Sequence, residues 1–583
     1  MRLSGPPAPR PRAPTVNALL ERASDARSGV TFVDLRERET FVSWAEVCRR
    51  ARRAAASLAA AGIRPGDRVA IVLRTEPAFL DAFFGVLLAG AVPAPLYPPV
   101  RLGRMDEYLA ATARMVTVSG ARAILAGGAV RRLLGGVVAR SRPPLGRRAA
   151  EELARGRDEL ARDVGRDELA LVQFSSGSTV DPKPVALTHG ALADHVETLL
   201  ALLRPGDSDA LVSWLPLYHD MGLIGGLLGA LAYPGPAVLI PPEHFLARPA
   251  LWLRAMSRHR GTIAAAPSFA YAYCVQRVRD SDLDGVDLSS WRVALDGAEP
   301  VSLPVLREFQ RRFASHGFRP DAMRPVYGLS EAALAVTFCD GAAEAKSVRV
   351  DPVALAATGE IREGPREVAS VGRPIPGVQV EIRDAHGRPA GADRLGRIWV
   401  AGPSLMSGYL GQAEATAKTL AGGWLDTGDL GFVHDGQLYV HGRAKDVVVV
   451  RGANHAPDEF EGALAGVAGL RPGCAVAGGL DVDGRGEELV LLVERARTAA
   501  GSEPEIAAAI RQAVTERTGV APREVVLLAP GSLPRTSSGK MRRAEALRRW
   551  LAGTLLPPRP VTPLALAREV ARSALGYARA RRG

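Results

Sequence analysis

The chain has 583 residues, of which 47% are hydrophobic and 23% charged, the balance of a globular protein with a large buried core. A chain of this length corresponds to about three or four domain-sized units. The four cysteines are scattered without a CxxC pair, which argues against a disulfide framework or a zinc site and favours a reducing, cytoplasmic compartment.

Basic chains often bind nucleic acid or anionic surfaces. Here the basic residues are nearly all arginine and are dispersed, so composition and a solvated surface explain the net charge of +12 better than a nucleic-acid partner does. Because arginine is the default cation, each retained lysine indicates a position that needs a compact ammonium. The five lysines are Lys183, Lys346, Lys418, Lys445 and Lys540.

The N-terminal arm, residues 1–15, is rich in Pro and Arg and lacks the apolar core of a secretion signal, so we expect it to be disordered. The uncharged stretch 221–242 is long enough to suggest a membrane span. However, Tyr233-Pro234-Gly235-Pro236 interrupts it. A buried helix followed by a short buried strand is therefore predicted, and no membrane span.

Residues 16–64 predict helices around a β-like segment near 30–41. Apolar strands and amphipathic helices then alternate, which indicates an α/β fold with a parallel sheet covered by helices. The predicted strands are 68–73, 121–126, 169–174, 210–214, 237–240, 262–266 and 291–295. The predicted helices are 78–91, 189–203, 222–231, 245–258, 269–279 and 303–316.

From residue 371 the pattern changes to short alternating strands with glycine turns, which predicts a small β-rich subdomain over about 371–442. This subdomain would complete a large N-terminal domain, residues 16–442. Residues 443–552 have the signals of a smaller α+β C-terminal domain. Residues 553–583 form a Pro-rich linker and a basic tail, which we interpret as a solvated helix rather than a membrane or partner contact.

The loop from Phe174 to Lys183 follows a predicted buried strand and is rich in serine, glycine and threonine. Hydroxyls and backbone N–H groups in such a loop can bind phosphate oxygens, and a lysine adds charge. It is not a Walker A motif, because no Gly-Lys-Ser/Thr follows at the right spacing. Taken alone, the loop fits an ordinary connection equally well.

Two further motifs carry chemistry. Tyr327-Gly328-Leu329-Ser330-Glu331 offers an aromatic ring for a base and a carboxylate for Mg²⁺, although a core tyrosine and a first-turn glutamate explain it equally simply. Asp429 lies in a predicted turn and could accept hydrogen bonds from ribose hydroxyls or serve only the turn. His219 precedes Asp220, a candidate helix N-cap, so the histidine has either a structural or a site role.

Together these motifs occur in an order that resembles the adenylate-forming superfamily of acyl-CoA synthetases, peptide-synthetase adenylation domains and luciferases. The resemblance spans about residues 15–550 and is strongest to the fatty-acyl-AMP ligases. The stretches that carry it are 174–183, 327–331, 427–429, 442–446 and 534–540, with the subfamily-type stretches 96–101, 213–223, 296–300 and 451–455. Residues 339–370 resemble an insertion of that subfamily, which restrains the C-terminal domain and disfavours CoA as acceptor.

The resemblance implies that Tyr327 stacks on adenine and Asp429 binds the ribose. Thr179 and Lys183, with neighbouring serines, would contact the β- and γ-phosphates, and Gly297-Ala298 would line the adenine edge. The full nucleotide set implied is Ser175, Ser176, Gly177, Ser178, Thr179, Lys183, Gly297, Ala298, Tyr327, Gly328, Asp429 and Arg443.

The catalytic residues that the resemblance implies are Lys540, Glu331 and His219. Lys540 would lie between the substrate carboxylate and the α-phosphate. Glu331, with Thr179, would hold Mg²⁺, and His219 would lie where the acyl pocket meets the nucleotide. Lys445 would be the hinge about which the C-terminal domain turns.

The chain departs from the superfamily at Val180 and Pro184, where glycine is usual. Valine at positive φ is an outlier and proline lacks an N–H, so we expect a reshaped loop or weaker phosphate binding. The acyl chain is predicted to lie along 221–231 and 269–273, where several glycines leave space.

The function implied is ATP-dependent activation of a fatty acid to acyl-adenylate. The acyl group would then pass to the phosphopantetheine thiol of an acyl carrier protein, and the enzyme would be a cytoplasmic monomer. The alternatives are an acyl-CoA synthetase and a non-catalytic nucleotide- or acyl-binding protein.

Overall fold

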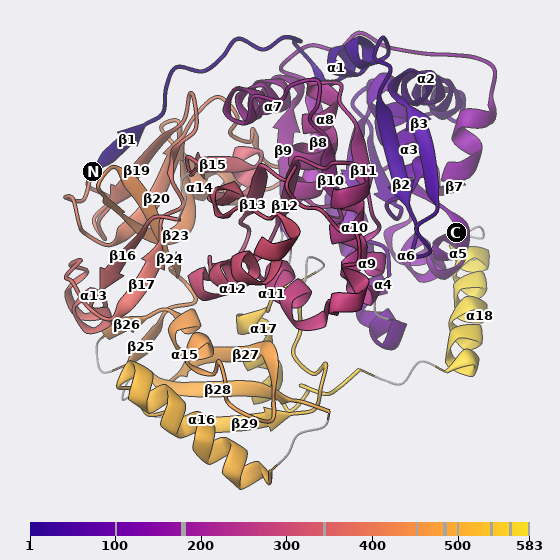
Figure 1. The fold of residues 1–583 in the computed structure, drawn as a ribbon. Helices are drawn as coiled ribbons and strands as arrows, with labels where there is room; N and C mark the ends of the chain where they lie inside the picture. The colour runs from indigo at the N-terminus through magenta and orange to yellow at the C-terminus, as the bar shows by residue number, and fades with distance from the viewer. Residues whose placement is uncertain are drawn as a thin grey trace.

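The computed structural model describes residues 1–99, 102–175, 182–341, 345–450, 453–481, 487–497, 501–536, 540–558 and 562–580. These residues form the predicted α/β fold, with a large N-terminal region of sheets and helices, a β-rich subdomain and a smaller α+β C-terminal domain (Figure 1). Within these ranges, no helix is both long and apolar enough to cross a membrane.

A nine-stranded sheet forms the centre of the N-terminal region. Its six middle strands are parallel, as the alternation of strands and helices predicted. In spatial order the strands are β18 (Arg373–Pro374), β15 (Ala335–Phe338), β14 (Met323–Gly328), β13 (Val293–Asp296), β12 (Ile263–Ala266), β10 (Leu211–Ser213), β11 (Ala237–Leu239), β2 (Gly29–Val33) and β3 (Glu39–Ser43).

Two smaller sheets complete this region. The parallel one has the order β5 (Val92–Pro95), β4 (Arg68–Val72), β6 (Ala123–Ala126) and β7 (Arg147–Ala149). The antiparallel one has the order β21 (Gly408–Tyr409), β9 (Pro184–Thr188) and β8 (Leu169–Phe174). Pro184 is the first residue of β9, a strand position that tolerates the missing N–H.

Helices cover the sheets and connect the parallel strands. They are α1 (Val16–Ala23), α2 (Trp44–Ala60), α3 (Pro77–Leu88), α4 (Met105–Val118), α5 (Gly128–Leu133), α6 (Gly135–Ser141), α7 (His189–Leu203), α8 (Gly229–Ala232), α9 (Pro242–Ala247), α10 (Ala250–Arg258), α11 (Ser268–Arg277) and α12 (Leu303–Phe313). The single helix predicted over 245–258 is instead two helices, because Pro249 cannot continue α9 and disfavours helical geometry at the residue before it.

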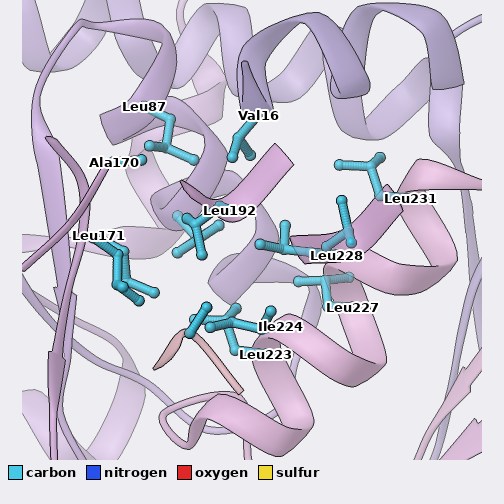
Figure 2. Packing of buried hydrophobic residues seen from close by; sticks show 14 of the residues in the cluster. Val16, Leu87, Ala170, Leu171, Leu192, Leu223, Ile224, Leu227, Leu228 and Leu231 are labelled. Atoms are coloured by element: carbon cyan, nitrogen blue, oxygen red, sulfur yellow. The ribbon is translucent and has the colours of Figure 1, made fainter. Parts of the chain in front are cut away.

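The segment Met221–Leu228 is a π-helix, η3, which continues into α8. A plain helix was predicted here; the segment is apolar all round, so its periodicity cannot distinguish the two geometries. Figure 2 shows its apolar side chains inside the core that it shares with α1, α3, α7 and β8. The labelled residues of η3 and α8 are Leu223, Ile224, Leu227, Leu228 and Leu231.

The β-rich subdomain is a six-stranded antiparallel sheet. Its order is β1 (Arg2–Ser4), β19 (Gln379–Arg383), β20 (Gly396–Ala401), β23 (Trp424–His434) and β22 (Leu420–Ala421), with β24 (Gln437–Arg443) also on β23. Part of the arm expected to be disordered is therefore ordered. β1 pairs with the otherwise open edge of β19, and an ion pair of 2.7 Å between Arg2 and Glu381 fixes it there.

The insertion-like segment and the C-terminal domain lie next to each other in Figure 1. The segment contains β16 (Ser347–Val350), α13 (Pro352–Thr358) and β17 (Arg366–Ala369), and α14 (Ala413–Thr419) follows later in the chain. The C-terminal domain contains β25 (Val448–Val450), β26 (Ala453–His455), α15 (Pro457–Ala463), β27 (Leu470–Leu480), β28 (Glu488–Arg495), α16 (Glu503–Thr518), β29 (Glu524–Leu528) and α17 (Arg543–Leu551).

The basic tail forms α18 (Pro563–Ala580). It was expected to be a solvated helix, but it lies against α5 and α6 of the N-terminal region (Figure 1). The expectation failed because the residues that face α6 are small or polar and give no apolar stripe in the sequence.

Candidate active site

A cavity of about 410 Å³ lies between the N-terminal region and the C-terminal domain. It brings together most of the residues singled out from the sequence, although they are up to 365 positions apart. Those that line it are Ser175, Lys183, His219, Ala298, Tyr327, Gly328, Glu331, Arg443, Lys445 and Lys540. Ser176, Gly177, Ser178, Thr179 and Val180 lie outside the described residues.

The two ends of the phosphate-loop candidate are joined to each other. The backbone N–H of Ser175 donates to the carbonyl of Lys183 at 3.0 Å, and the N–H of Lys183 donates to the Ser175 hydroxyl at 3.3 Å. The Lys183 ammonium lies 4.3 Å from the ring centroid of Tyr409, a cation–π distance. These contacts fix the base of the loop and direct Lys183 to the cavity.

Glu331 is held by the same tyrosine. The Tyr409 hydroxyl donates to Glu331 Oε1 at 2.9 Å, so Tyr409 positions both the lysine and the carboxylate. Burial raises the pKa of Glu331, and the Tyr409 hydroxyl opposes that rise. A bound cation would favour the ionised form further.

Asp429 lies behind the cavity wall rather than on it. Its Oδ1 pairs with Arg443 Nε at 2.7 Å, and its Oδ2 accepts the Tyr327 hydroxyl at 2.7 Å. The neighbouring Thr427 and Gly428 line the cavity instead. In this arrangement Asp429 orients the two side chains that were expected to surround the base and the ribose.

Gly297 and Ala298 differ in position despite being adjacent. A Cβ on Gly297 would lie 2.7 Å from Val326 Cγ2, so this glycine permits close packing of β13 on β14. Ala298 lines the cavity and has φ of 68°, an unusual value for a residue with a side chain. Strained backbone of this kind often occurs at functional sites.

His219 and Asp220 form a buried pair at the start of η3. Asp220 Oδ1 lies 2.7 Å from His219 Nδ1 and accepts the Met221 N–H at 2.7 Å, while Oδ2 accepts the Ser330 hydroxyl. Burial alone would raise the pKa of Asp220, but His219 and Ser330 outweigh it and hold the pKa far below its usual value. With Nδ1 facing Asp220, His219 presents Nε2 to other partners.

Lys540 is a cationic residue of the C-terminal domain that lines the same cavity. Its backbone N–H and C=O form two hydrogen bonds with Thr536, of 3.0 and 2.8 Å, and its side chain lines the cavity. Burial lowers the pKa of Lys540, and the carboxylates of Glu299 and Asp220 oppose that shift. A distant lysine therefore completes a cavity built from N-terminal residues, as the sequence predicted.

The other end of the cavity is apolar. It extends along the sheet to the first residues of β10 and β12, Leu211 and Ile263, which are neighbours across the two strands. Gly225 and Gly226 of η3 form part of its wall. A Cβ on Gly226 would find its nearest neighbour at 3.7 Å, so a first side-chain carbon would fit there in ordinary contact.

Comparison with known proteins agrees with this geometry. A family model described as AMP-binding enzyme matches residues 20–410. A putative acyl-CoA synthetase of Caulobacter vibrioides is 35% identical over 93% of this chain and 96% of its own length. The chain belongs to the AMP-binding enzyme family.

Two further proteins place this AMP-binding enzyme more narrowly. The medium-chain-fatty-acid–[acyl-carrier-protein] ligase JamA of Moorena producens is 33% identical, over 94% of this chain and 96% of its own. A structure from work on the fatty acyl-adenylate ligases of E. coli and L. pneumophila has a TM-score of 0.87 and 32% identity, covering 94% of this chain and 99% of its own. The resemblance to fatty-acyl-AMP ligases is confirmed.

Sequence reasoning missed three residues of this AMP-binding enzyme that organise the cavity. Asp220 was considered only as a helix cap, although its place next to His219 was a usable signal. Ser330 was within a quoted motif but had no assigned partner. Tyr409 gave no signal, because only the folded chain brings it next to Lys183 and Glu331.

Proposed function

We propose that this enzyme activates a fatty acid with ATP, forming acyl-adenylate and pyrophosphate, and then passes the acyl group to the phosphopantetheine thiol of an acyl carrier protein. The single observation that carries the proposal is the continuity of the cavity. Its polar end holds Lys183, Glu331 and Lys540, and its apolar end reaches Leu211 and Ile263. One ligand with a phosphate at one end and an alkyl chain at the other matches both.

The polar end suits the first step. A carboxylate oxygen of the fatty acid bonds to the α-phosphorus of ATP while the bond to the pyrophosphate oxygen breaks. Negative charge builds on the α-phosphate oxygens, and a preorganised cation beside them lowers the barrier. Lys540 is assigned this role, because it lines the cavity and its backbone is held by hydrogen bonds to Thr536.

Lys183 is assigned to the phosphates that leave, because its ammonium lies at the base of the phosphate-loop candidate. His219 is assigned to the junction of acyl chain and nucleotide, where Asp220 fixes its orientation. Tyr327 and Arg443, both tied to Asp429, are assigned to the adenosine.

The residues present fit a magnesium ion bound with ATP. Mg²⁺ is usually held by one or two protein carboxylates plus substrate phosphates, and Glu331 supplies one carboxylate that lines the cavity. When bound, Mg²⁺ would neutralise charge on the phosphates of ATP. Tyr409 contributes by holding Glu331 in place.

The apolar end favours a fatty acid over an amino acid. The lining residues around Leu211 and Ile263 are mostly leucine, isoleucine, alanine and glycine, with Ser213 as a polar neighbour, and they include no carboxylate that could hold an α-amino group. We also propose a monomeric, cytoplasmic enzyme; the four cysteines are free and buried, as expected in a reducing compartment.

The test is fatty-acid-dependent exchange of labelled pyrophosphate into ATP, followed by product analysis with CoA or a holo-carrier protein as acceptor. We expect exchange with fatty acids and acyl transfer to the carrier. Absence of exchange with every fatty acid tested would contradict the proposal. Rapid acyl-CoA formation would instead favour the activity named for the Caulobacter relative.

A further inference from the structure

The C-terminal helix α18 docks on the N-terminal region through one narrow face. Among its described side chains, the ones that are not exposed are Glu569, Ser573, Gly576 and Tyr577, which recur at helical spacing. Leu566, Val570 and Leu575 of the same helix face solvent. Apart from the Tyr577 ring, which packs against a buried apolar cluster, the described residues of this face are small or polar, and Leu566, Val570 and Leu575 lie away from it.

The contact is close at its centre. The Gly135 N–H donates to the Ser573 hydroxyl at 2.7 Å, and Ser573 is 1% exposed. A Cβ on Gly576 would lie 2.6 Å from the carbonyl oxygen of Gly135. The backbones of α6 and α18 thus approach each other so closely that each helix has a glycine at the contact, Gly135 in α6 and Gly576 in α18.

Tyr577 forms the second half of the contact. Its hydroxyl donates to the carbonyl of Arg131 at the end of α5, and the Arg147 guanidinium lies 4.0 Å from its ring centroid. Backbone, hydroxyl and ring contacts together specify one docked position. A helix held only by chance against a neighbour would not be expected to combine all three.

Residues on both sides of α17 are also held. The Arg104 guanidinium, at the N-terminus of α4, donates to the carbonyls of Gly531, Ser532 and Leu556 at 3.0–3.2 Å. Arg549 of α17 pairs with Glu107 of α4 at 2.9 Å. The C-terminal domain is thus fixed to the N-terminal region close to the point where its last helix ends.

We propose that α18 is a strap that ties the end of the C-terminal domain to the N-terminal region and favours the arrangement in which Lys540 lines the cavity. With α18 docked, the domain is attached at both ends, by the chain at Lys445 and by the strap. The 11 residues from 552 to 562 span at most about 40 Å when extended, and several are proline, which limits how far the domain can turn.

The contact between α18 and the N-terminal region is weak enough for the helix to detach. Leu566, Val570 and Leu575 stay exposed when α18 is docked, so among the large apolar side chains described in this helix only Tyr577 contributes the apolar burial that is the main source of stable packing. A contact made of hydrogen bonds and small residues has a modest net free energy. The inference rests on the proposed function in one respect: carrier-protein transfer is the step that would require the C-terminal domain to move.

Gly576→Leu tests the strap, because its side chain cannot fit against Gly135 and leucine favours the helix itself. Ala574→Leu is the matched control, since Ala574 is exposed on the same helix. A chain ending at residue 561 is a second variant that removes the contact without relying on one substitution.

The first readout is domain position, which does not depend on the activity. Spin labels at Val118→Cys and Glu516→Cys, exposed positions on α4 and α16, report the distance between the two parts, and the native cysteines are buried. We expect one narrow distance population in the parent chain and in Ala574→Leu, and an added population in Gly576→Leu and in the truncated chain. An unchanged distribution in both disruptive variants would overturn the proposal.

The second readout is the ratio of acyl transfer to carrier over pyrophosphate exchange. We expect this ratio to rise about fivefold or more in Gly576→Leu, because fivefold is the lower end of the usual range of coupling between two sites. The ratio should stay unchanged in Ala574→Leu. A new distance population with an unchanged ratio would show that the strap does not restrain the domain's working motion, and would overturn its role. Absence of exchange in the parent chain would count against the proposed function and leave the distance test valid.

Discussion

At the residue scale, the chain positions charged groups with other side chains rather than leaving them isolated in the cavity. Asp220 holds His219 and Ser330, Tyr409 holds Glu331, and Asp429 joins Tyr327 to Arg443. Such preorganisation removes the cost of orienting groups during the reaction. The charges that would face substrate phosphates are therefore fixed before substrate binds.

Asp220→Asn tests this network. The amide can still cap η3 but loses the charge that faces His219. We therefore expect the rate of adenylation to fall about 10- to 100-fold, which corresponds to the net free energy of a hydrogen bond to a charged group. Steady-state kinetics should assign the loss to kcat rather than to the KM for ATP. Ser330→Ala, which removes only the hydroxyl contact, should lose less. Equal activity in Asp220→Asn and the parent enzyme would count against a positioning role.

The pH dependence of adenylation should reflect the protonation state of the Lys540 side chain. Burial lowers its pKa, and a lysine acts here only while protonated, so activity should be present below that pKa and lost as pH rises through it. The alkaline limb should thus lie below the ordinary lysine value of about 10.4. Residual activity of Lys540→Arg should lack this limb, because arginine keeps its proton. A flat wild-type profile up to pH 10 would contradict the assignment.

The residues that the sequence predicted correctly for this cavity are those within contiguous motifs, such as Tyr327, Glu331 and Lys540. The spacing and residue types of these motifs resembled a known chemistry, and the roles that it implies stay predictions. Asp429 was predicted to bind the ribose directly, and that role stays a prediction. In the structure its carboxylate contacts Arg443 and Tyr327, and these contacts depend on side-chain geometry, which spacing along the chain does not encode.

At the element scale, η3 separates the core from the cavity. Its leucines pack in the core, as Figure 2 shows, while Gly225 and Gly226 face the cavity. π-helices are rare and often occur at functional sites. The sequence located this element and its glycines but not its π-geometry, and it joined α9 and α10 into one helix despite Pro249.

Gly226→Leu should shorten the acids that the enzyme accepts. The first carbon of the new side chain fits in ordinary contact beside Leu211 and Ser213. Because these residues line the cavity, we expect the rest of the leucine to occupy the apolar end and short acids to react normally. Long acids should lose about tenfold or more in kcat/KM, a typical effect of a few methylene groups in a pocket. Gly229→Leu is the control, because Gly229 is outside the cavity wall. An unchanged chain-length profile would show that the acyl chain lies elsewhere.

At the scale of the whole molecule, contacts between distant segments decide where the C-terminal domain lies. Arg104, Glu107 and the docking face of α18 hold it from one side. On the other side, Arg366 of β17 pairs with Asp458 and Glu459 of α15. The sequence predicted the segments but not these contacts. Single arginines and small residues form no sequence pattern from which their contact partners could be predicted.

Arg366→Ala should loosen the insertion-like segment from α15. If that segment restrains the C-terminal domain, the change should raise acyl-CoA formation about fivefold or more, within the usual range of coupling between sites. Arg362→Ala is the control, since Arg362 belongs to the same segment but pairs with Glu360 at its exposed surface. Equal acyl-CoA formation by Arg366→Ala, Arg362→Ala and the parent enzyme would remove Arg366 from any restraint.

The central claim is that one cavity, completed by Lys540, joins a fatty acid to AMP. Incubation with ATP, Mg²⁺ and a fatty acid, without any acceptor, should yield enzyme-bound acyl-adenylate that mass spectrometry detects directly. Lys540→Ala should form it about 10²- to 10³-fold more slowly while still binding ATP, which calorimetry would verify. No acyl-adenylate from the parent enzyme, or equal rates for both, would contradict the account.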